Sequence, residues 1–398
     1  MSDAITPIVD EILPEVVRLR QDLHAHPELS FQERSTAGKV RAILRELPGV
    51  EVSPPIMETD VVAVLDTGRP GRCMGIRADL DALPLDEEAS LEEVAYRSTV
   101  PGVMHACGHD GHTATLVGTA MVLSRLAPQM SGKVKFIFQP GEEEGGGAKT
   151  LCAEGVMTNP QVDAIIALHA WPVRSVGTVS LRYGPALASN DPFFVTIRGH
   201  GSHGAYPQKG IDPIVASAHI VTALQTVVAR NVAPIDAAVV TIGAINAGAT
   251  TNIIPAECRM QGTLRHLRPE VGELLRRRVR EIIEWTARAH GATADLRFEE
   301  GYPPVVNDDT MCRLVEEAAR DMLGPEGIAT DEPPSLGVED FSYYGQRTPS
   351  VMFRLGVRPR HMEDYPPLHN PRFNFNDDAL SVGIRVFCEV TRRFLAGA

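Results

Sequence analysis

The feature that most constrains the fold of this chain is an alternation of short apolar runs with longer helical patterns. Strand-like runs begin at Val61, Cys73, Lys133 and Ala164. A helical stretch, HTATLVGTAMVLSRLA, separates the second run from the third. Strands and helices in this order predict an α/β fold with a largely parallel sheet. Ligands of such sheets bind near the carboxyl ends of the strands, so the residues that follow each run are candidates for chemistry.

The alternation is interrupted once, between Pro185 and about Pro304. Inside that interval the pattern becomes strand, helix, strand, strand, helix, strand, which is the order of the split ferredoxin-like unit. The six elements are expected at residues 191–199, 212–230, 237–245, 256–264, 268–290 and 292–300. We therefore predict one domain in two parts, residues 1–184 and 306–398, and an inserted ferredoxin-like α+β domain at residues 185–305.

Composition places the chain among soluble globular proteins. Its 398 residues are 43% hydrophobic and 22% charged, which is enough apolar material for sizeable cores. The net charge of −13 argues against nucleic acid as a partner, because phosphate-backbone binding needs a basic face. No apolar run approaches the ~20 residues of a membrane span, and the acidic N-terminal segment does not resemble a secretory signal. The six cysteines are scattered without a CxxC pair, which favours a reducing, cytoplasmic setting.

One glycine-rich motif could be mistaken for a nucleotide site. Residues 199–204 read GHGSHG after a predicted strand, so they match GxGxxG. A dinucleotide fingerprint also needs its third glycine to open a helix, whereas Pro207 and Gly210 follow here. We therefore expect neither NAD nor FAD as a cofactor.

The segment MHACGHDGHTA, residues 104–114, concentrates side chains that bind metals. Cys107 and His109 lie two positions apart in a glycine-containing turn before a helix. In extended backbone such residues point the same way, so a thiolate and an imidazole could converge on a borderline-soft ion such as zinc. A buried structural cysteine beside loop histidines explains the pair about equally well, although His105 and His112 crowd round the same cysteine.

Three glutamates, Glu142, Glu143 and Glu144, come directly after the run FIFQPG. Adjacent carboxylates at a strand end can divide labour, one binding a metal and its neighbour acting as general base on a water. The alternative is a solvated acidic turn. The position weakens that alternative, because this strand end is expected at the same sheet edge as Cys107.

Two further histidines follow predicted strands, His169 in AIIALHAWP and His369 in PPLHNP. Either alone is more often a polar residue of the core. Together with Cys107, His109 and Glu143 they form a ligand set large enough for two ions. The sequence therefore favours a metal site at this edge of the sheet.

Two aspartates, Asp79 and Asp81, follow another predicted strand in GIRADLDALPL. Carboxylates at this position could orient metal-binding imidazoles by accepting hydrogen bonds from them. Helix capping by Asp81, or a simple turn, remains the alternative.

These residues, with GHGSHGAYP, TNIIP, GVEDFSYY and PPLHNP, resemble the motifs of the aminoacylase/carboxypeptidase G-like dinuclear metallohydrolases. The chain is most similar to the branch of hippurate hydrolases and indoleacetyl-amino-acid hydrolases, from Arg20 almost to the C-terminus. The resemblance implies two divalent ions (Zn, Mn, Co or Ni) and Glu142 as general base. The ligands that it implies are Cys107, His109, Glu143, His169 and His369. The chain departs from the wider family's HxDxxP signature, since Asp79 stands where histidine is usual.

The resemblance also implies roles for the inserted domain, which in this family forms a lid and mediates dimerisation. His203 matches the histidine that reaches into the partner's active site, and Asn252 matches an asparagine near the substrate. A homodimer or homotetramer is therefore expected. Arg265 is a further candidate for binding the carboxylate of a substrate.

The expected function is metal-dependent hydrolysis of N-acyl-L-amino acids to a carboxylic acid and a free amino acid. Glu142 would take a proton from the attacking water and deliver it to the leaving amine, while His203 and a metal stabilise the oxyanion. The alternatives are a dipeptidase or carboxypeptidase with the same site, or a non-catalytic metal-dependent binding protein. The expected partner is a small-molecule substrate, with neither nucleic acid nor membrane.

Overall fold

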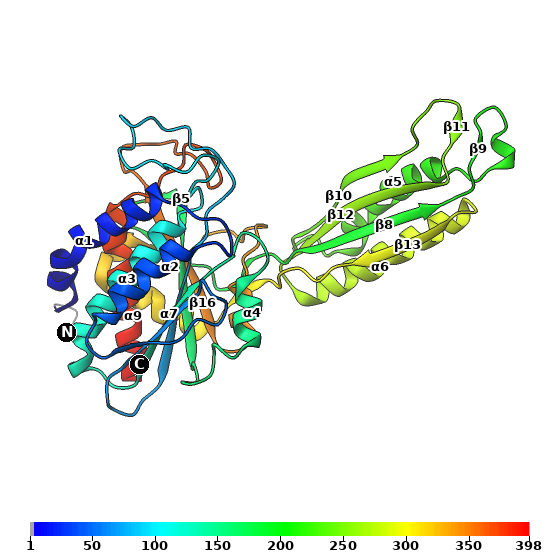
Figure 1. Ribbon diagram of the computed structural model, residues 1–398. Helices are drawn as coiled ribbons and strands as arrows, with labels where there is room; N and C mark the ends of the chain where they lie inside the picture. Colours follow the sequence, from blue (N-terminus) through cyan, green and yellow to red (C-terminus); the bar gives the residue numbers. More distant parts are fainter. Residues whose placement is uncertain (1–3, 398) are drawn as a thin grey trace. The chain divides into compact units, whose positions relative to one another are not determined.

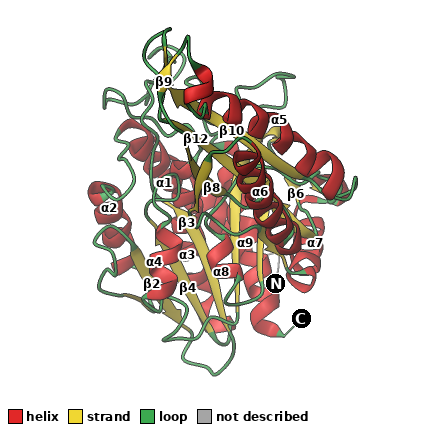
Figure 2. Ribbon diagram, turned by 90° about the vertical axis from the view of Figure 1, so that its right-hand side faces the viewer, coloured by secondary structure: helices red, strands yellow, loops and turns green. Residues whose placement is uncertain are grey.

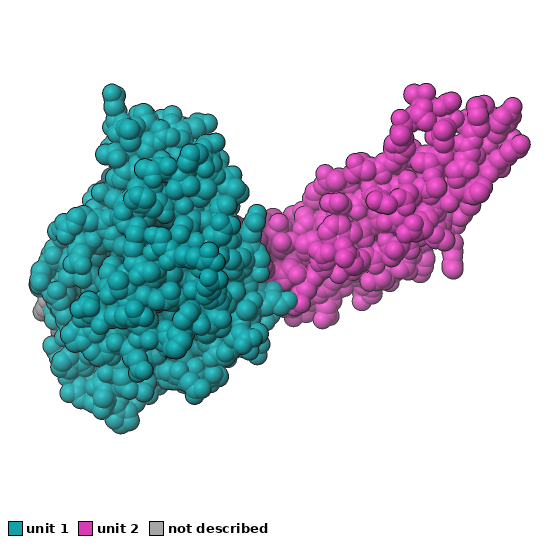
Figure 3. Space-filling view, viewed as in Figure 1, with its two compact units in different colours: residues 1–184, 306–333, 340–398 teal, residues 185–305, 334–339 magenta. Residues whose placement is uncertain are grey.

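The computed structural model describes residues 4–397, which form two compact units (Figure 3). The first unit consists of Met1–Gly184, Val306–Pro333 and Asp340–Ala398, and the second consists of Pro185–Val305 and Pro334–Glu339. All of residues 306–398 were expected in the main domain, but Pro334–Glu339 belongs to the second unit. This segment joins the second unit because Ser335 N donates to Ala186 O (2.9 Å) and Ala188 N donates to Gly337 O (3.0 Å).

The first unit is built on an eight-stranded sheet with the order β1-β2-β4-β3-β5-β16-β6-β15. The central strands β4, β3, β5 and β16 are parallel, whereas β1, β2 and β6 each pair antiparallel with a neighbour. The predicted α/β fold with a largely parallel sheet is therefore confirmed, and Figure 2 shows β2, β4 and β3 side by side. The strands are β1 (Val50–Val52), β2 (Val61–Asp66), β3 (Cys73–Asp79), β4 (Lys133–Gln139), β5 (Ala164–Ser175), β6 (Val179–Ser180), β15 (Ile328–Ala329) and β16 (Ser350–Arg358).

The main helices of this unit gather on one side of the sheet (Figure 1). They bury the alternate apolar residues of the strands, for example Phe136 of β4 and Phe353 of β16. The opposite face of the same strands carries polar residues and is accompanied by two short helices, α4 (Gly147–Ala153) and α8 (Ser342–Gly345). The main helices are α1 (Ile5–Ala25), α2 (Arg34–Arg45), α3 (His109–Leu126), α7 (Asp309–Leu323) and α9 (Asp378–Ala396).

The second unit is an antiparallel four-stranded sheet with the order β10-β12-β8-β13, covered by two helices. Its elements follow one another as β-α-β-β-α-β, in agreement with the ferredoxin-like pattern of the sequence. A two-stranded ribbon, β9 (Ser202–His203) with β11 (Ile253–Ile254), extends from the sheet. The main elements are β8 (Asp191–Arg198), α5 (Pro213–Asn231), β10 (Ala238–Ala247), β12 (Glu257–His266), α6 (Pro269–Ala289) and β13 (Thr293–Phe298); β7 (Gly184–Leu187) and β14 (Val305–Asn307) lie at the chain crossings between the units.

Helix α5 departs from the expectation that no apolar run approaches the length of a membrane span. It has 19 residues with a mean hydropathy of 1.2, so by length and composition alone it qualifies as a candidate span. Its buried residues, including Ile220 and Leu224, pack into the core of the second unit. Ile214 and Val215 on another face are 43% and 46% exposed.

Candidate metal centre

Cys107 and His109 come together at the start of α3, although not for the reason that the sequence suggested. The residue between them, Gly108, has a φ of 88°, so the backbone is left-handed here rather than extended. A side chain at Gly108 would also lie 3.0 Å from the Cβ of Ala170, which favours glycine for both reasons. Cys107 Sγ lies 3.6 Å from Nε2 of His169, which projects from β5. The turn and the neighbouring strand therefore aim a thiol and an imidazole at one point.

The glutamate turn after β4 reaches the same place. Glu143 N donates to Asp81 Oδ2 (2.9 Å), which holds the turn against the end of β3. Glu143 Oε1 then lies 3.9 Å from His109 Nε2 and 3.2 Å from His369 Nε2. Glu142 is 6% exposed and belongs to a group with His109 and Glu143 whose ligand atoms lie within 4.8 Å of one another.

His369 reaches the cluster from the loop between β16 and α9. Its backbone has a φ of 64°, which is unusual for a residue with a side chain, and its N–H donates to Ala106 O (2.8 Å). Two ligand groups share Cys107: one contains His109 and His169, and the other contains Glu143 and His369. The structure thus brings together all five predicted ligands and Glu142.

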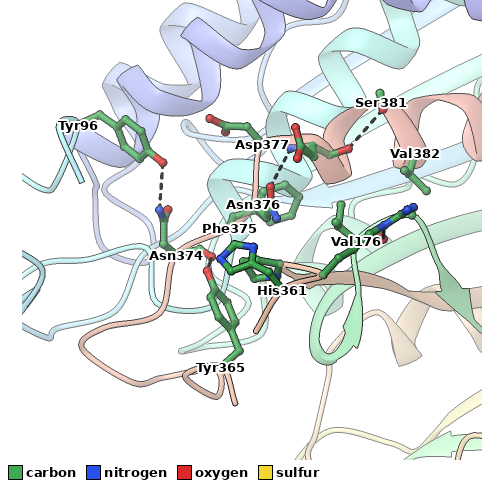
Figure 4. A pocket seen from close by; sticks show the side chains of 14 residues that line it. Tyr96, Val176, His361, Tyr365, Asn374, Phe375, Asn376, Asp377, Ser381 and Val382 are labelled. Carbon is green, nitrogen blue, oxygen red and sulfur yellow. Dashed lines mark hydrogen bonds between the residues drawn. The ribbon is translucent and has the colours of Figure 1, made fainter. Parts of the chain in front are cut away.

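The end of the His369 loop is anchored beside a pocket of about 680 Å³ at the start of α9 (Figure 4). Asn374 Nδ2 donates to Tyr96 Oη (3.0 Å), and the buried Arg20 donates to Asp377 Oδ1 (2.7 Å). His361, in the same loop, also lines this pocket. None of the residues that line the pocket is a predicted metal ligand; the hydrogen bonds of Asn374 and Asp377 hold the end of the His369 loop.

The hydrogen bonds around His109 leave one ring nitrogen for a cation. Its Nδ1 lies 2.9 Å from Asp81 O and 3.2 Å from Asp81 Oδ1, so this nitrogen carries the proton. Its Nε2 is buried and has no hydrogen-bond partner among residues 4–397. A buried nitrogen that lacks a partner and faces a thiol and carboxylates fits a divalent metal ion. Asp81 therefore makes the contact with an imidazole that the sequence predicted.

Asp79 contacts a different histidine more closely. Its Oδ1 lies 2.7 Å from Nδ1 of His112, whereas its nearest approach to His109 Nε2 is 3.8 Å. His112 Nε2 accepts a hydrogen bond from Ala170 N (2.8 Å), so both ring nitrogens of His112 are engaged. His112 therefore connects Asp79, the last residue of β3, to Ala170 within β5.

The sequence did not reveal a buried ion-pair network that includes Asp79. Arg77 Nη1 donates to Asp79 Oδ2 (2.6 Å), and Arg77 Nη2 donates to Asp340 Oδ1 (3.0 Å). Gln139 accepts from Arg77 Nε (2.9 Å) and donates to both oxygens of Asp340 (2.8 Å each). The one signal for it in the sequence is an arginine inside the otherwise apolar run CMGIRA.

Without a bound cation, the acidic residues change the protonation of the cluster. Burial lowers the pKa of His109, but Asp79, Asp81 and Glu143 outweigh it and raise that pKa to about 10. Burial and the nearby Glu143 and Glu142 raise the pKa of the Cys107 thiol well above its ordinary value. A proton thus occupies the position where a metal ion fits, and a divalent cation would favour the thiolate.

The three remaining candidates lie in the second unit, at two ends of its sheet. His203 on β9 pairs with Ile253, and Gly204 N donates to Asn252 O (2.8 Å), so His203 and Asn252 are neighbours in the ribbon. Arg265 lies near the other end of β12, whose Leu264 pairs with the first residue of β8. The ribbon extends from the opposite end of β8, and eight strand residues span roughly 25 Å. Within one chain, Asn252 and Arg265 therefore cannot hold the same carboxylate.

Comparisons with known proteins identify the family of this chain. The family model "Peptidase family M20/M25/M40" matches residues 75–393. The chain is 38% identical over 375 residues to N-acetylcysteine deacetylase of Bacillus subtilis (strain 168), covering 94% of this chain and 95% of the relative. It is 42% identical over 308 residues to N-acyl-L-amino acid amidohydrolase of Geobacillus stearothermophilus, covering 77% and 82%.

A solved structure extends the similarity to three dimensions. The Bacillus subtilis YXEP protein, described as a dinuclear metal binding peptidase from the M20 family, aligns with a TM-score of 0.85 and 34% identity. The alignment covers 98% of this chain and 100% of that chain. The family model covers most of the sequence, and the Bacillus subtilis relatives match almost end to end. The resemblance inferred from the motifs is therefore confirmed: the chain belongs to peptidase family M20/M25/M40 and is a metal-dependent amidohydrolase.

Proposed function

We propose that this enzyme hydrolyses the amide bond of N-acyl-L-amino acids at a centre of two divalent ions. The observation that carries the proposal is the pair of ligand groups that share Cys107, with Glu142 beside them. Cys107, His109, Glu143, His169 and His369 would hold the ions, which we expect to be Zn, Mn, Co or Ni. Ions in this position supply Lewis acidity toward the amide carbonyl and make a water more acidic.

Glu142 is the proposed general base, because it stands next to Glu143 in a turn whose second glutamate is directed at His109 and His369. Its carboxylate would accept a proton from the attacking water and return it to the leaving nitrogen. Asp81 keeps the Nδ1 proton on His109, which fixes the tautomer that the ligand role needs. The presence of Glu142 in the cluster favours a hydrolase over a non-catalytic binding protein.

We further propose that two copies associate through the second unit. Strand β10 is the end strand of its sheet, and Ile245 on it is 51% exposed. Helix α5 packs against β10 and exposes Ile214 and Val215. An unpaired strand edge beside exposed apolar side chains is a surface that a second copy would cover.

In such a dimer, His203 would serve the partner's centre and stabilise the oxyanion there. Asn252, its neighbour in the ribbon, would contact the substrate in the same site. Arg265 lies at the other end of the sheet. In any one active site, the arginine and the His203–Asn252 pair would therefore come from different subunits. The six free cysteines suit the cytoplasm, which we propose as the compartment.

The test is a substrate panel assayed with defined metal content. N-acetyl, N-benzoyl and indoleacetyl amino acids would be compared with dipeptides that carry a free amine. We expect turnover of the N-acyl compounds, loss of turnover with a chelator and recovery with Mn, Co, Ni or Zn. A clear preference for dipeptides would assign a dipeptidase instead, and full activity of metal-free protein would contradict the metal centre.

A further inference from the structure

Strand β16 lies next to β5 and carries an arginine directly across from His169. Strand β16 runs parallel to β5, with Arg354 paired with His169. Phe353 and Leu355, on either side of Arg354, are buried in the apolar core together with Leu168 of β5. Side chains alternate along a strand, so Arg354 projects from the same face as His169. An arginine thus stands beside a predicted metal ligand, because the backbones of neighbouring strands lie roughly 5 Å apart.

Arg354 is held in place by stacking and by a few polar contacts. Its guanidinium lies 4.1 Å from the ring centroid of Trp171, which is two residues beyond His169 and on the same face. Its Nη1 donates to Pro333 O (3.0 Å) and lies 3.5 Å from Glu332 Oε1. The side chain is 7% exposed. A buried guanidinium held over an indole ring is arranged for recognition of a planar anion.

The charges around Arg354 do not balance. Glu332 is buried, and its carboxylate already accepts hydrogen bonds from Trp171 Nε1 (3.2 Å) and Arg174 Nε (2.8 Å). Arg182 Nη1 approaches the backbone oxygen of Glu332 at 3.4 Å. Two guanidinium groups, those of Arg354 and Arg174, therefore contact one buried carboxylate, and a third, that of Arg182, lies against its backbone. The other carboxylate nearby, Asp331, pairs with Arg174 (3.4 Å) and is 86% exposed.

Two of these guanidinium groups have unused buried donors. Arg354 Nη2 and Arg182 Nε are buried without a hydrogen-bond partner in the described part of the chain. Burial lowers the pKa of Arg354, and the neighbouring Arg182 and Arg174 lower it further against the opposing effect of Glu332. Buried donors without acceptors, in a group with excess positive charge, are arranged for an anion.

We propose that Arg354 binds a second carboxylate of the substrate, beyond the α-carboxylate that every N-acyl amino acid carries. The inference rests on the proposed function and narrows it to dicarboxylic substrates. The second carboxylate could belong to the side chain of the amino acid or to the acyl group. Arg354 would act as a specificity residue, with Trp171 as the surface that fixes its orientation.

The experiment compares charged substrates with neutral isosteres. The first pair is N-acetylglutamate and N-acetylglutamine, and the second is N-succinylleucine and N-succinamoylleucine. We expect the wild-type enzyme to favour the charged member of one pair by about 10–100-fold in kcat/KM, since hydrogen bonds to a charged group contribute that much. The pair that shows the preference identifies which end of the substrate carries the carboxylate.

Variants connect the preference to Arg354. Arg354→Met should reduce the preference to near unity, mainly through KM of the charged substrate, while kcat/KM for the neutral isostere and the metal content stay unchanged. Arg354→Lys should restore part of the preference for the charged substrate. Arg174→Met is the matched control, because Arg174 contacts the same Glu332 but has no unused buried donor among the residues described.

The outcomes separate the two proposals. If N-acetylleucine is hydrolysed but neither pair shows a charge preference, the role of Arg354 is wrong and the proposed function stands. If Arg354→Met keeps the preference, the role of Arg354 is also wrong. Glutarate as an inhibitor gives a measurement independent of turnover: its inhibition constant should rise in Arg354→Met and stay constant in Arg174→Met. Failure to hydrolyse any N-acyl amino acid would overturn the proposed function itself.

Discussion

The two faces of the eight-stranded sheet are made by the same strands and have opposite chemistry. On the helix-covered face, alternate residues such as Phe136 and Phe353 are fully buried among other apolar side chains. On the other face, the residues next to them in sequence are Lys135 and Arg354, which are also buried. The comparison separates two kinds of burial, one that needs only complementary shape and one that needs hydrogen-bond partners for every group.

The polar face satisfies most of its groups internally and leaves a few others without a partner in the described part of the chain. Arg77, Asp340 and Gln139 bond to one another and to Asp79. His109 Nε2 at the start of α3 and Arg354 Nη2 on β16 have no hydrogen-bond partner among residues 4–397. Groups that lack internal partners are available to a metal or a substrate, so function is expected where these atoms lie.

The strongest test of the polar face concerns its two adjacent glutamates. Glu142→Gln should lower kcat by about 10²–10⁴-fold and keep the metal bound, because a general base is lost and a ligand is not. Glu143→Gln should instead lose metal, because Glu143 Oε1 faces His109 and His369. Metal analysis and steady-state kinetics on both variants decide the assignment. The reverse result would exchange the two roles, and normal hydrolysis by both would contradict the mechanism.

Removal of Arg77 should affect stability and the centre together. Arg77→Met removes the guanidinium that contacts both buried carboxylates, Asp79 and Asp340, which costs about 3–5 kcal/mol of unfolding free energy. Because Asp79 also holds His112, metal affinity should fall as well. Denaturant unfolding and metal titration measure the two effects, with Arg77→Lys as the control that keeps the charge. Unchanged metal affinity in Arg77→Met would show that this network serves the fold alone.

The apolar face should show a stability effect without a functional one. Phe353 is fully buried, and its ring packs edge-on against Phe387 at 5.4 Å. Phe353→Ala should cost about 3–5 kcal/mol of unfolding free energy, whereas Phe353→Leu should cost less. Metal content and kcat per folded molecule should stay normal in both. A loss of metal by folded Phe353→Ala would mean that the two faces are coupled more closely than the comparison suggests.

The candidate ligands were placed together because the sequence suggested that they follow strands, although His169 lies within β5 rather than at its end. Parallel strands bring their carboxyl ends to one edge, so residues distant in sequence could be placed together from strand positions alone. The pairing of Arg77 with Asp340 could not be placed in this way, because 263 positions separate them and Asp340 follows no strand of the sheet. The ribbon of β9 and β11 has two residues in each strand, which is too short to show a periodicity.

Local geometry limited the prediction in a second way. Cys107 and His109 converge because Gly108 is left-handed, whereas the sequence argument assumed extended backbone. His112 was visible in the motif, but only its two hydrogen bonds show that it connects Asp79 to Ala170. Residue spacing can therefore indicate which side chains meet, while the role of each depends on where its hydrogen bonds go.

The smallest expected effect tests how the polar face accommodates a charge without a carboxylate. Lys135 is 1% exposed, and its Nζ donates to the backbone oxygens of Val156 (2.8 Å), Thr158 (2.8 Å) and Pro160 (2.9 Å). Burial lowers the pKa of Lys135 to about 8. The folded protein therefore releases this proton at a lower pH than the unfolded chain does. Stability should rise with pH from about 8 toward the unfolded value of 10.5, because over that range the unfolded state binds more protons.

The measurement is the difference in unfolding free energy between wild type and Lys135→Met as a function of pH. Lys135→Met will be less stable throughout, since three buried carbonyls lose their donor, but the change with pH is the informative quantity. Wild type should gain about 1 kcal/mol on the variant between pH 7.5 and 9. Lys133→Met is the matched control on the same strand: Lys133 is paired with Asp66, which raises its pKa, so its difference curve should be flat in this window. A flat curve for Lys135→Met as well would show that the three carbonyls compensate the buried ammonium fully, and that this face tolerates a charge as readily as the solvent does.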